Sequence, residues 1–298
     1  MPGLSIRTQS GKWIDAPAIA DAYVVNGGQM LQRWTNDVFL ATPHRAINRS
    51  GGERYAIPFF CDSNIDWPVA AVPTTVGPDK PPKYPTTWYT DYMVWYQKRN
   101  YDADTDASKP PSERAVANHS RHRSGPLSRG RARRVAAHGR RAAFRADRDR
   151  LLLHRQSRRA RGAESARSSA RPRAFHALPL ERKMDVRIDR HNVGYLPLRG
   201  DTLRTSTVQT VTKANLNEAL FVARDLPADH PDVLADRRFR SANRWPADLP
   251  GFRETVVAYC DDAGAAGAKA GAALRLRARP AGGLFRRSVH ASSSTSCA

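Results

Sequence analysis

Short apolar stretches alternate with turn-forming residues through the first 107 residues of the chain. The apolar run at 22–25 precedes a glycine-rich turn at 26–28, and the run at 55–60 follows another at 48–52. Runs of this length, bounded by turn formers, are typical of β-strands with tight connections. The pattern predicts a β-rich segment over residues 1–107, of the kind found in sandwiches and barrels.

Apolar residues recur at helical spacing in three places, which we expect to form helices. Residues 90–98 close the first segment, and residues 213–224 and 251–260 lie within a mixed segment at 176–262. Together the two segments predict an α+β protein.

The net charge of +21 is confined to two segments. Residues 108–175 carry 20 Lys and Arg against 4 Asp and Glu, and residues 263–298 carry 6 against none. Both are dominated by Arg, Ala, Ser and Gly, with no sustained period. Because such a composition buries too little apolar surface to offset the entropy of ordering, we expect both segments to be disordered.

Several protein classes are excluded by the same composition. No run of about 18 apolar residues occurs, and charged residues interrupt the first thirty positions, so neither a membrane span nor a signal peptide is expected. The 3 cysteines lie far apart, which does not fit a disulfide framework or a zinc site. We expect a cytoplasmic protein that does not associate with membranes.

Residues 26–60 contain three motifs in a fixed order: N-G-G-Q-M-L-Q-R-W-T-N, then T-P-H-R followed by N-R-S-G, then E-R-Y-A-I-P-F-F. In this order they resemble the carboxyl-terminal half of the isopenicillin N synthase-like Fe(II)/2-oxoglutarate-dependent oxygenases. The P-P-K-Y and D-Y sequences at 81–84 and 91–92 resemble the closing segment of that family. The resemblance therefore covers residues 1–107.

A second segment, with Trp245-Pro246 and L-P-G-F-R at 249–253, resembles the amino-terminal region of the same family. The family order is thus inverted in this chain. The resemblance implies an incomplete double-stranded β-helix (jelly-roll) piece and a helical amino-terminal-type block, with disordered basic segments. The expected divisions are residues 1–107, 108–175, 176–262 and 263–298.

The resemblance also implies two cofactors, Fe(II) and 2-oxoglutarate. The family holds Fe(II) with two histidines and one carboxylate, and an arginine pairs with the distal carboxylate of the keto acid. By position, His44 matches the distal iron ligand and Arg54 matches the 2-oxoglutarate anchor. The serine that the family places two residues after this arginine is Ala56 here.

The family's H-x-D ligand pair is expected shortly before Gly3, where the sequence does not supply it. His230-Pro231-Asp232 has the right letters but lies in the amino-terminal-type segment, so we do not expect it to be a ligand pair. The resemblance thus predicts an oxidoreductase of the dioxygenase family, acting on a small-molecule substrate, that is impaired or inactive as encoded.

The basic segments have a second interpretation in a shifted reading frame. Codons chosen for residues 150–159 read GFFYIANHGV after a shift of one nucleotide, and those chosen for residues 278–290 read LDLPAGYFDEAFT. Both strings resemble family segments expected at those places. Because GC-rich codons read out of frame yield Arg, Ala, Gly and Ser, we interpret the basic segments as frame-shifted coding sequence.

An alternative function is nonspecific binding of nucleic acid or another polyanion through residues 108–175, without catalysis. Such a basic segment attracts phosphates with strong salt dependence. Aromatic residues for base stacking are not interleaved with the arginines, so this binding would lack sequence preference.

Overall fold

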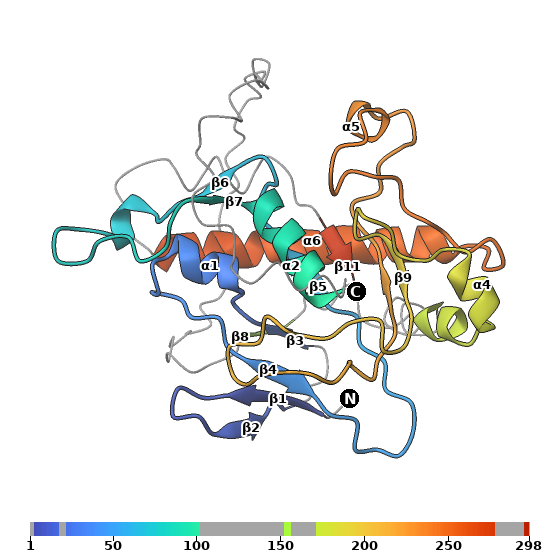
Figure 1. Cartoon of the computed structure of the whole chain (residues 1–298), viewed down its shortest axis with the longest axis horizontal. Coiled ribbons are helices and arrows are strands. Elements are labelled where there is room, and N and C mark those ends of the chain that lie inside the picture. Colours follow the sequence, from blue (N-terminus) through green and yellow to red (C-terminus); the bar gives the residue numbers. More distant parts are fainter. Residues whose placement is uncertain (1–2, 18–21, 102–151, 156–170, 278–294, 298) are drawn as a thin grey trace.

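The computed structural model of the chain describes residues 3–17, 22–101, 152–155, 171–277 and 295–297. Helices and small antiparallel sheets are mixed in an α+β arrangement, as predicted (Figure 1). The strands are β1 (Leu4–Arg7), β2 (Trp13–Asp15), β3 (Ala22–Val25), β4 (His44–Ala46), β5 (Phe59–Cys61), β6 (Pro68–Val69), β7 (Thr87–Trp88), β8 (Leu152–Arg155), β9 (Gly194–Leu196), β10 (Ala219–Phe221) and β11 (Thr295–Cys297). The helices are α1 (Gln29–Trp34), the 3-10 helix η1 (Pro73–Thr75), α2 (Tyr89–Asn100), α4 (Leu180–Met184), α5 (Pro231–Leu234) and α6 (Phe252–Arg277).

The largest sheet among the described residues has the order β2-β1-β4, with both pairs antiparallel. Ile6 on the central strand faces Ile14 on one side and His44 on the other. Because side chains alternate along a strand, these three lie on one face of the sheet, while Ser5 and Arg45 lie on the opposite face. His44 is therefore placed on the more apolar face.

The described residues up to 101 combine short strands with helices, and the predicted strand at 22–25 and helix at 90–98 correspond to β3 and α2. The structure adds α1, which the sequence pattern does not indicate. In the predicted strand at 55–60, only the last two residues belong to β5.

A second hydrophobic core lies in the later part of the chain, around α4, β9 and the start of α6. Phe175, Val186, Tyr195 and Phe252 form its buried centre. Phe175 belongs to a helical stretch at 171–176.

Parts of the basic segments that the structure describes form regular elements, which the composition does not predict. Residues 152–155 form β8, residues 171–175 are helical, and α6 continues through residue 277. The physical reasons differ. Phe175 contributes a large apolar side chain to the core, and the alanine-rich stretch at 263–277 extends an existing helix, which needs no new nucleus.

The predicted helix at 213–224 is also wrong, because residues 219–221 form β10 and pair with β9. The helical spacing of its apolar residues does not correspond to burial, since Leu216 is 76% exposed. The helix predicted at 251–260 is confirmed as the first part of α6.

The two parts of the chain pack together. Figure 1 shows α6 passing behind α1 and α2, and β5 lies against it. Phe59 of β5 packs with Val222 and Cys260 in a small shared core. Tyr259 of α6 donates a hydrogen bond to the carbonyl oxygen of Ile57 at 3.1 Å. The described residues at 22–101 and 171–277 thus pack against each other.

Within the described part of the chain, no helix combines the length and the apolar character that crossing a bilayer requires.

Candidate functional site

His44 begins β4 and is exposed, opposite the buried Ile6 of β1. Its Nδ1 atom lies 3.1 Å from the carbonyl oxygen of Thr42 and 3.2 Å from the side-chain amide nitrogen of Asn26. The tautomer with a proton on Nδ1 donates to Thr42 and leaves the lone pair of Nε2 for a ligand. In this tautomer the carbonyl oxygen of Thr42 orients the imidazole, because the side-chain nitrogen of Asn26 is itself a donor and cannot bond to a protonated Nδ1.

Arg54 lies at the other end of the same strand pair, beside Gly3. A methyl group added at Gly3 would lie 3.3 Å from Arg54 Nε and 2.5 Å from the carbonyl oxygen of Ile47. Since Gly3 has a φ of 113°, it adopts a backbone conformation that suits glycine. Ile47 is three residues from His44, about 10 Å along a strand. The structure thus places His44 on the sheet, and the side chain of Arg54, which comes from a loop, beside the far end of the same strand pair.

The described residues do not fit an Fe(II) site of two histidines and one carboxylate. Nowhere among them do three or more His, Cys, Asp or Glu side chains gather as a metal site would require. One imidazole holds iron weakly, because such sites draw their affinity from several ligands and the groups that orient them. A guanidinium such as that of Arg54 does suit a carboxylate.

The H-P-D sequence at 230–232 has a structural role. His230 is the N-cap of α5, and its Nδ1 accepts a hydrogen bond from the backbone nitrogen of Asp232 at 3.1 Å. The Asp232 carboxylate accepts a hydrogen bond from Arg237 at 2.7 Å. Both side chains are used in local structure.

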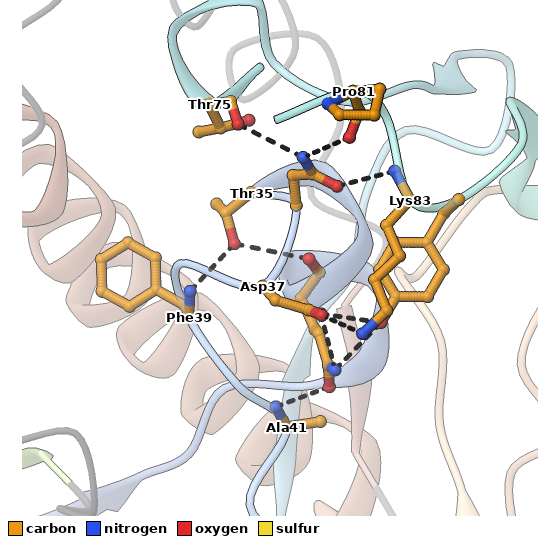
Figure 2. A network of polar contacts seen from close by, with 10 residues as sticks. Thr35, Asp37, Phe39, Ala41, Thr75, Pro81 and Lys83 are labelled. Atoms are coloured by element: carbon orange, nitrogen blue, oxygen red, sulfur yellow. Dashed lines mark hydrogen bonds and ion pairs between the residues drawn. The ribbon is translucent and has the colours of Figure 1, made fainter. Parts of the chain in front are cut away.

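A network of polar contacts fixes the turn that leads from α1 toward β4 (Figure 2). Asn36 is buried and has a φ of 48°. Its side-chain amide donates to the carbonyl oxygens of Thr75 and Pro81, and its side-chain oxygen accepts from the backbone nitrogen of Lys83 at 2.9 Å. The W-T-N part of the sequence motif therefore ties α1 to the 75–83 loop.

Asp37 continues this network on the adjacent side of the turn (Figure 2). Its carboxylate forms an ion pair with Lys83 and accepts hydrogen bonds from Tyr84 at 2.7 Å and from Gln32 at 2.9 Å. Partial burial alone would raise the pKa of Asp37, but these hydrogen bonds outweigh it and lower the pKa to about 2.

We expect Asp37→Asn to lower the free energy of unfolding by about 1–2 kcal/mol at neutral pH, because the ion pair and charge-assisted hydrogen bonds are lost. A depressed pKa contributes stability above the ordinary value of 3.8 that disappears as the pH falls toward 2. Denaturant unfolding from pH 5 to pH 2 should therefore show a shallower acid loss in the variant. The control Asp79→Asn, at an exposed position, should lose as much stability between pH 5 and pH 2 as the wild type. The same acid loss in Asp37→Asn as in the wild type would contradict the role of the Asp37 carboxylate.

A buried polar cluster in the second part of the chain has no signal in the sequence. Glu218 accepts hydrogen bonds from Lys183 at 2.8 Å and from Tyr195, and its other carboxylate oxygen lies 2.9 Å from His176 Nδ1. Burial alone would raise the pKa of Glu218, but these hydrogen bonds outweigh it and lower the pKa. The partners come from separate elements and have no motif spacing, so only the fold reveals them.

Sequence comparison matches two family descriptions to the chain. Residues 1–63, which include His44 and Arg54, match the 2OG-Fe(II) oxygenase superfamily. Residues 164–248 match the amino-terminal region of a non-haem dioxygenase in morphine synthesis. The family descriptions and the relatives below support the 2-oxoglutarate–Fe(II) oxygenase family for both segments. The amino-terminal description matches the later oxygenase segment, in agreement with the predicted inverted order.

Individual relatives support this assignment. The 2-oxoglutarate-Fe(II) type oxidoreductase hxnY of Emericella nidulans is 37% identical over 108 residues, which are 36% of this chain and 31% of hxnY. The 2-oxoglutarate-dependent dioxygenase traH of Penicillium crustosum is 47% identical over 55 residues, 18% of this chain and 17% of traH. This chain therefore covers less than a third of the length of these relatives.

A solved structure is also similar over a part of its length. The putative 2OG-Fe(II) oxygenase family protein from Caulobacter crescentus is 26% identical, with a TM-score of 0.28. The similarity covers 35% of this chain and 32% of that protein. Family names and descriptions imply Fe(II) and 2-oxoglutarate as the cofactors of the oxygenase family.

Proposed function

We propose that this chain carries the keto-acid side of a 2-oxoglutarate oxygenase site, and that the chain alone has little or no oxygenase activity. In this proposal His44 is the one inherited iron ligand and Arg54 is the anchor for the distal carboxylate of 2-oxoglutarate. The substrate to be oxidised is a small molecule, as in the family.

The observation that carries the proposal is the position of His44. The imidazole lies on the apolar face of the β2-β1-β4 sheet with Nδ1 turned toward Thr42, so Nε2 has the orientation of a ligand. Arg54 lies beside the same pair of strands. The proposal is supported by the approach of both side chains to the same strand pair, His44 from β4 and Arg54 from the loop that follows it.

The proposed loss of activity follows from the number of ligands. Two further protein ligands are needed for a facial triad, and the described residues do not bring them to His44. In fold terms, we propose that residues 1–107 are an incomplete jelly-roll piece and that residues 176–262 are the family's amino-terminal-type region. Binding of polyanions by residues 108–175 remains a prediction, because most of that segment lies outside the described residues.

The test measures both the turnover of 2-oxoglutarate and its binding to the chain. Release of labelled carbon dioxide from 2-oxoglutarate, measured with Fe(II) and oxygen, is expected to equal the blank without protein. Equilibrium dialysis should show weak 2-oxoglutarate binding that falls at least about tenfold in Arg54→Ala, because the carboxylate loses a charge-assisted partner.

Arg49→Ala is the matched control, since Arg49 is an exposed arginine in the same segment, 4.0 Å from Asp15. This variant should keep the keto-acid affinity of the wild type. Tight, stoichiometric uptake of Fe(II) with turnover, or equal losses in the two arginine variants, would show that the proposal is wrong.

A further inference from the structure

The last turn of α2 is enclosed by residues that follow it by about a hundred positions. Asn100 is 1% exposed, and Gln97 is also buried. The side chain of Asn100 contacts Thr205 in both directions: Nδ2 donates to Thr205 Oγ1 at 3.0 Å, and Oδ1 accepts from the Thr205 backbone nitrogen at 3.1 Å. Nδ2 also donates to the carbonyl oxygen of Tyr96 at 3.0 Å. One buried amide therefore has its donors and acceptor satisfied across the two parts of the chain.

The later part of the chain also caps the helix. The last carbonyl groups of an α-helix have no partner within the helix. Here the backbone nitrogen of Thr202 donates to the carbonyl oxygen of Asn100 at 2.9 Å, and Arg204 donates to that of Arg99 at 3.1 Å. The end of α2 is thus completed by residues 202–205.

Two arginines extend the contact to the side of the helix. Arg238 donates to the side-chain oxygen of Gln97 at 2.6 Å, and Arg237 forms an ion pair with Asp66 in the loop before β6. The ring of Tyr101 lies 6.1 Å from that of Phe221. Backbone caps, a buried amide, charged groups and an aromatic contact together resemble a recognition interface.

We infer that residues 201–205, together with Arg237 and Arg238, form a docking surface for the carboxyl-terminal turn of α2. This surface, added to the packing of β5 against α6, lets the two parts of the chain bind each other without the covalent connection between them. The occupant is the α2 segment of this chain, with Asn100 as its central anchor. This binding does not depend on iron or on keto acid.

The first test cuts the purified full-length chain. A specific protease site inserted after residue 128 lies between the two parts and outside the described residues. After cleavage, the two pieces should elute together in size-exclusion chromatography at about 10 µM, a concentration above the dissociation constants of specific interfaces. Separation of the pieces at this concentration would overturn the inference.

The second test measures how much Asn100 contributes to the affinity between the two pieces. In the cleaved protein, Asn100→Ala should raise the dissociation constant at least about tenfold, because Thr205 loses its buried partner. Thr205→Val removes the hydroxyl from the other side and keeps the shape of the residue. Because the two side chains contact each other, the double variant should be weakened less than the product of the single effects.

Asn48→Ala is the matched control, since Asn48 is exposed and its amide bonds locally to Gly52. It should leave the dissociation constant unchanged within about twofold. Far-ultraviolet circular dichroism of each uncut variant checks that it is folded. If Asn100→Ala does not fold, the dissociation constant of Thr205→Val tests the same contact. Independent, multiplying effects of Asn100→Ala and Thr205→Val, or an equal loss in Asn48→Ala, would contradict the role of Asn100.

Discussion

Phe175→Ala is expected to lower the free energy of unfolding by about 3–5 kcal/mol, the cost of removing a fully buried phenylalanine. Phe175 is 0% exposed and lies at the centre of the second core. Its ring lies 5.8 Å from that of Tyr195 and 5.9 Å from that of Phe252. Because these neighbours come from different elements, the cavity cannot close by a local shift.

Urea unfolding followed by tryptophan fluorescence measures this loss, since Trp245 packs 6.2 Å from Phe252. Phe60→Ala is the matched control: Phe60 is 48% exposed, and its truncation should cost less than about 1 kcal/mol. Similar midpoints for the two variants would mean that Phe175 does not belong to a cooperative core.

Glu218→Gln is expected to lower the free energy of unfolding by about 3 kcal/mol. The substitution leaves the ammonium group of Lys183 buried without its carboxylate, and breaking a buried pair from one side is costly. The hydrogen bonds from Tyr195 and His176 are weakened in the same step.

The pH dependence distinguishes this effect from simple loss of packing. Because the folded protein holds the pKa of Glu218 below its ordinary value of 4.5, the carboxylate contributes stability above that value which is lost as the pH falls through the lower one. The penalty of Glu218→Gln, measured by urea unfolding, should therefore shrink in acid. Glu181→Gln, on the exposed face of α4, should show no such penalty at any pH.

Local patterns were sufficient to predict much of the first part of the chain. β3 and α2 could be predicted because the spacing of apolar residues and the position of turn-forming residues are local signals that extend over only a few residues. The motifs indicate His44 and Arg54, and the structure places His44 on a strand and the side chain of Arg54 beside the end of the same strand pair. Their roles in iron and keto-acid binding remain predictions.

Other features could not be predicted because they depend on contacts that are distant in sequence. β10 has helix-like apolar spacing, but pairing with β9 and the contact of Glu218 with Lys183 decide its conformation. The composition of residues 263–277 indicates disorder by its lack of large apolar residues, but alanine is the best helix former and these residues continue α6. The burial of Phe175 likewise depends on partners that come later in the chain.

The capping of α2 by residues 202–205 has a consequence for synthesis on the ribosome. Asn100 and Thr205 are separated by 105 positions. At about 5–20 residues per second, the helix emerges about 5–20 s before the residues that complete its end. During this interval the last carbonyl groups of α2 and the side chain of Asn100, which are covered in the folded protein, are exposed to water. Chaperones therefore have time to bind before folding is complete.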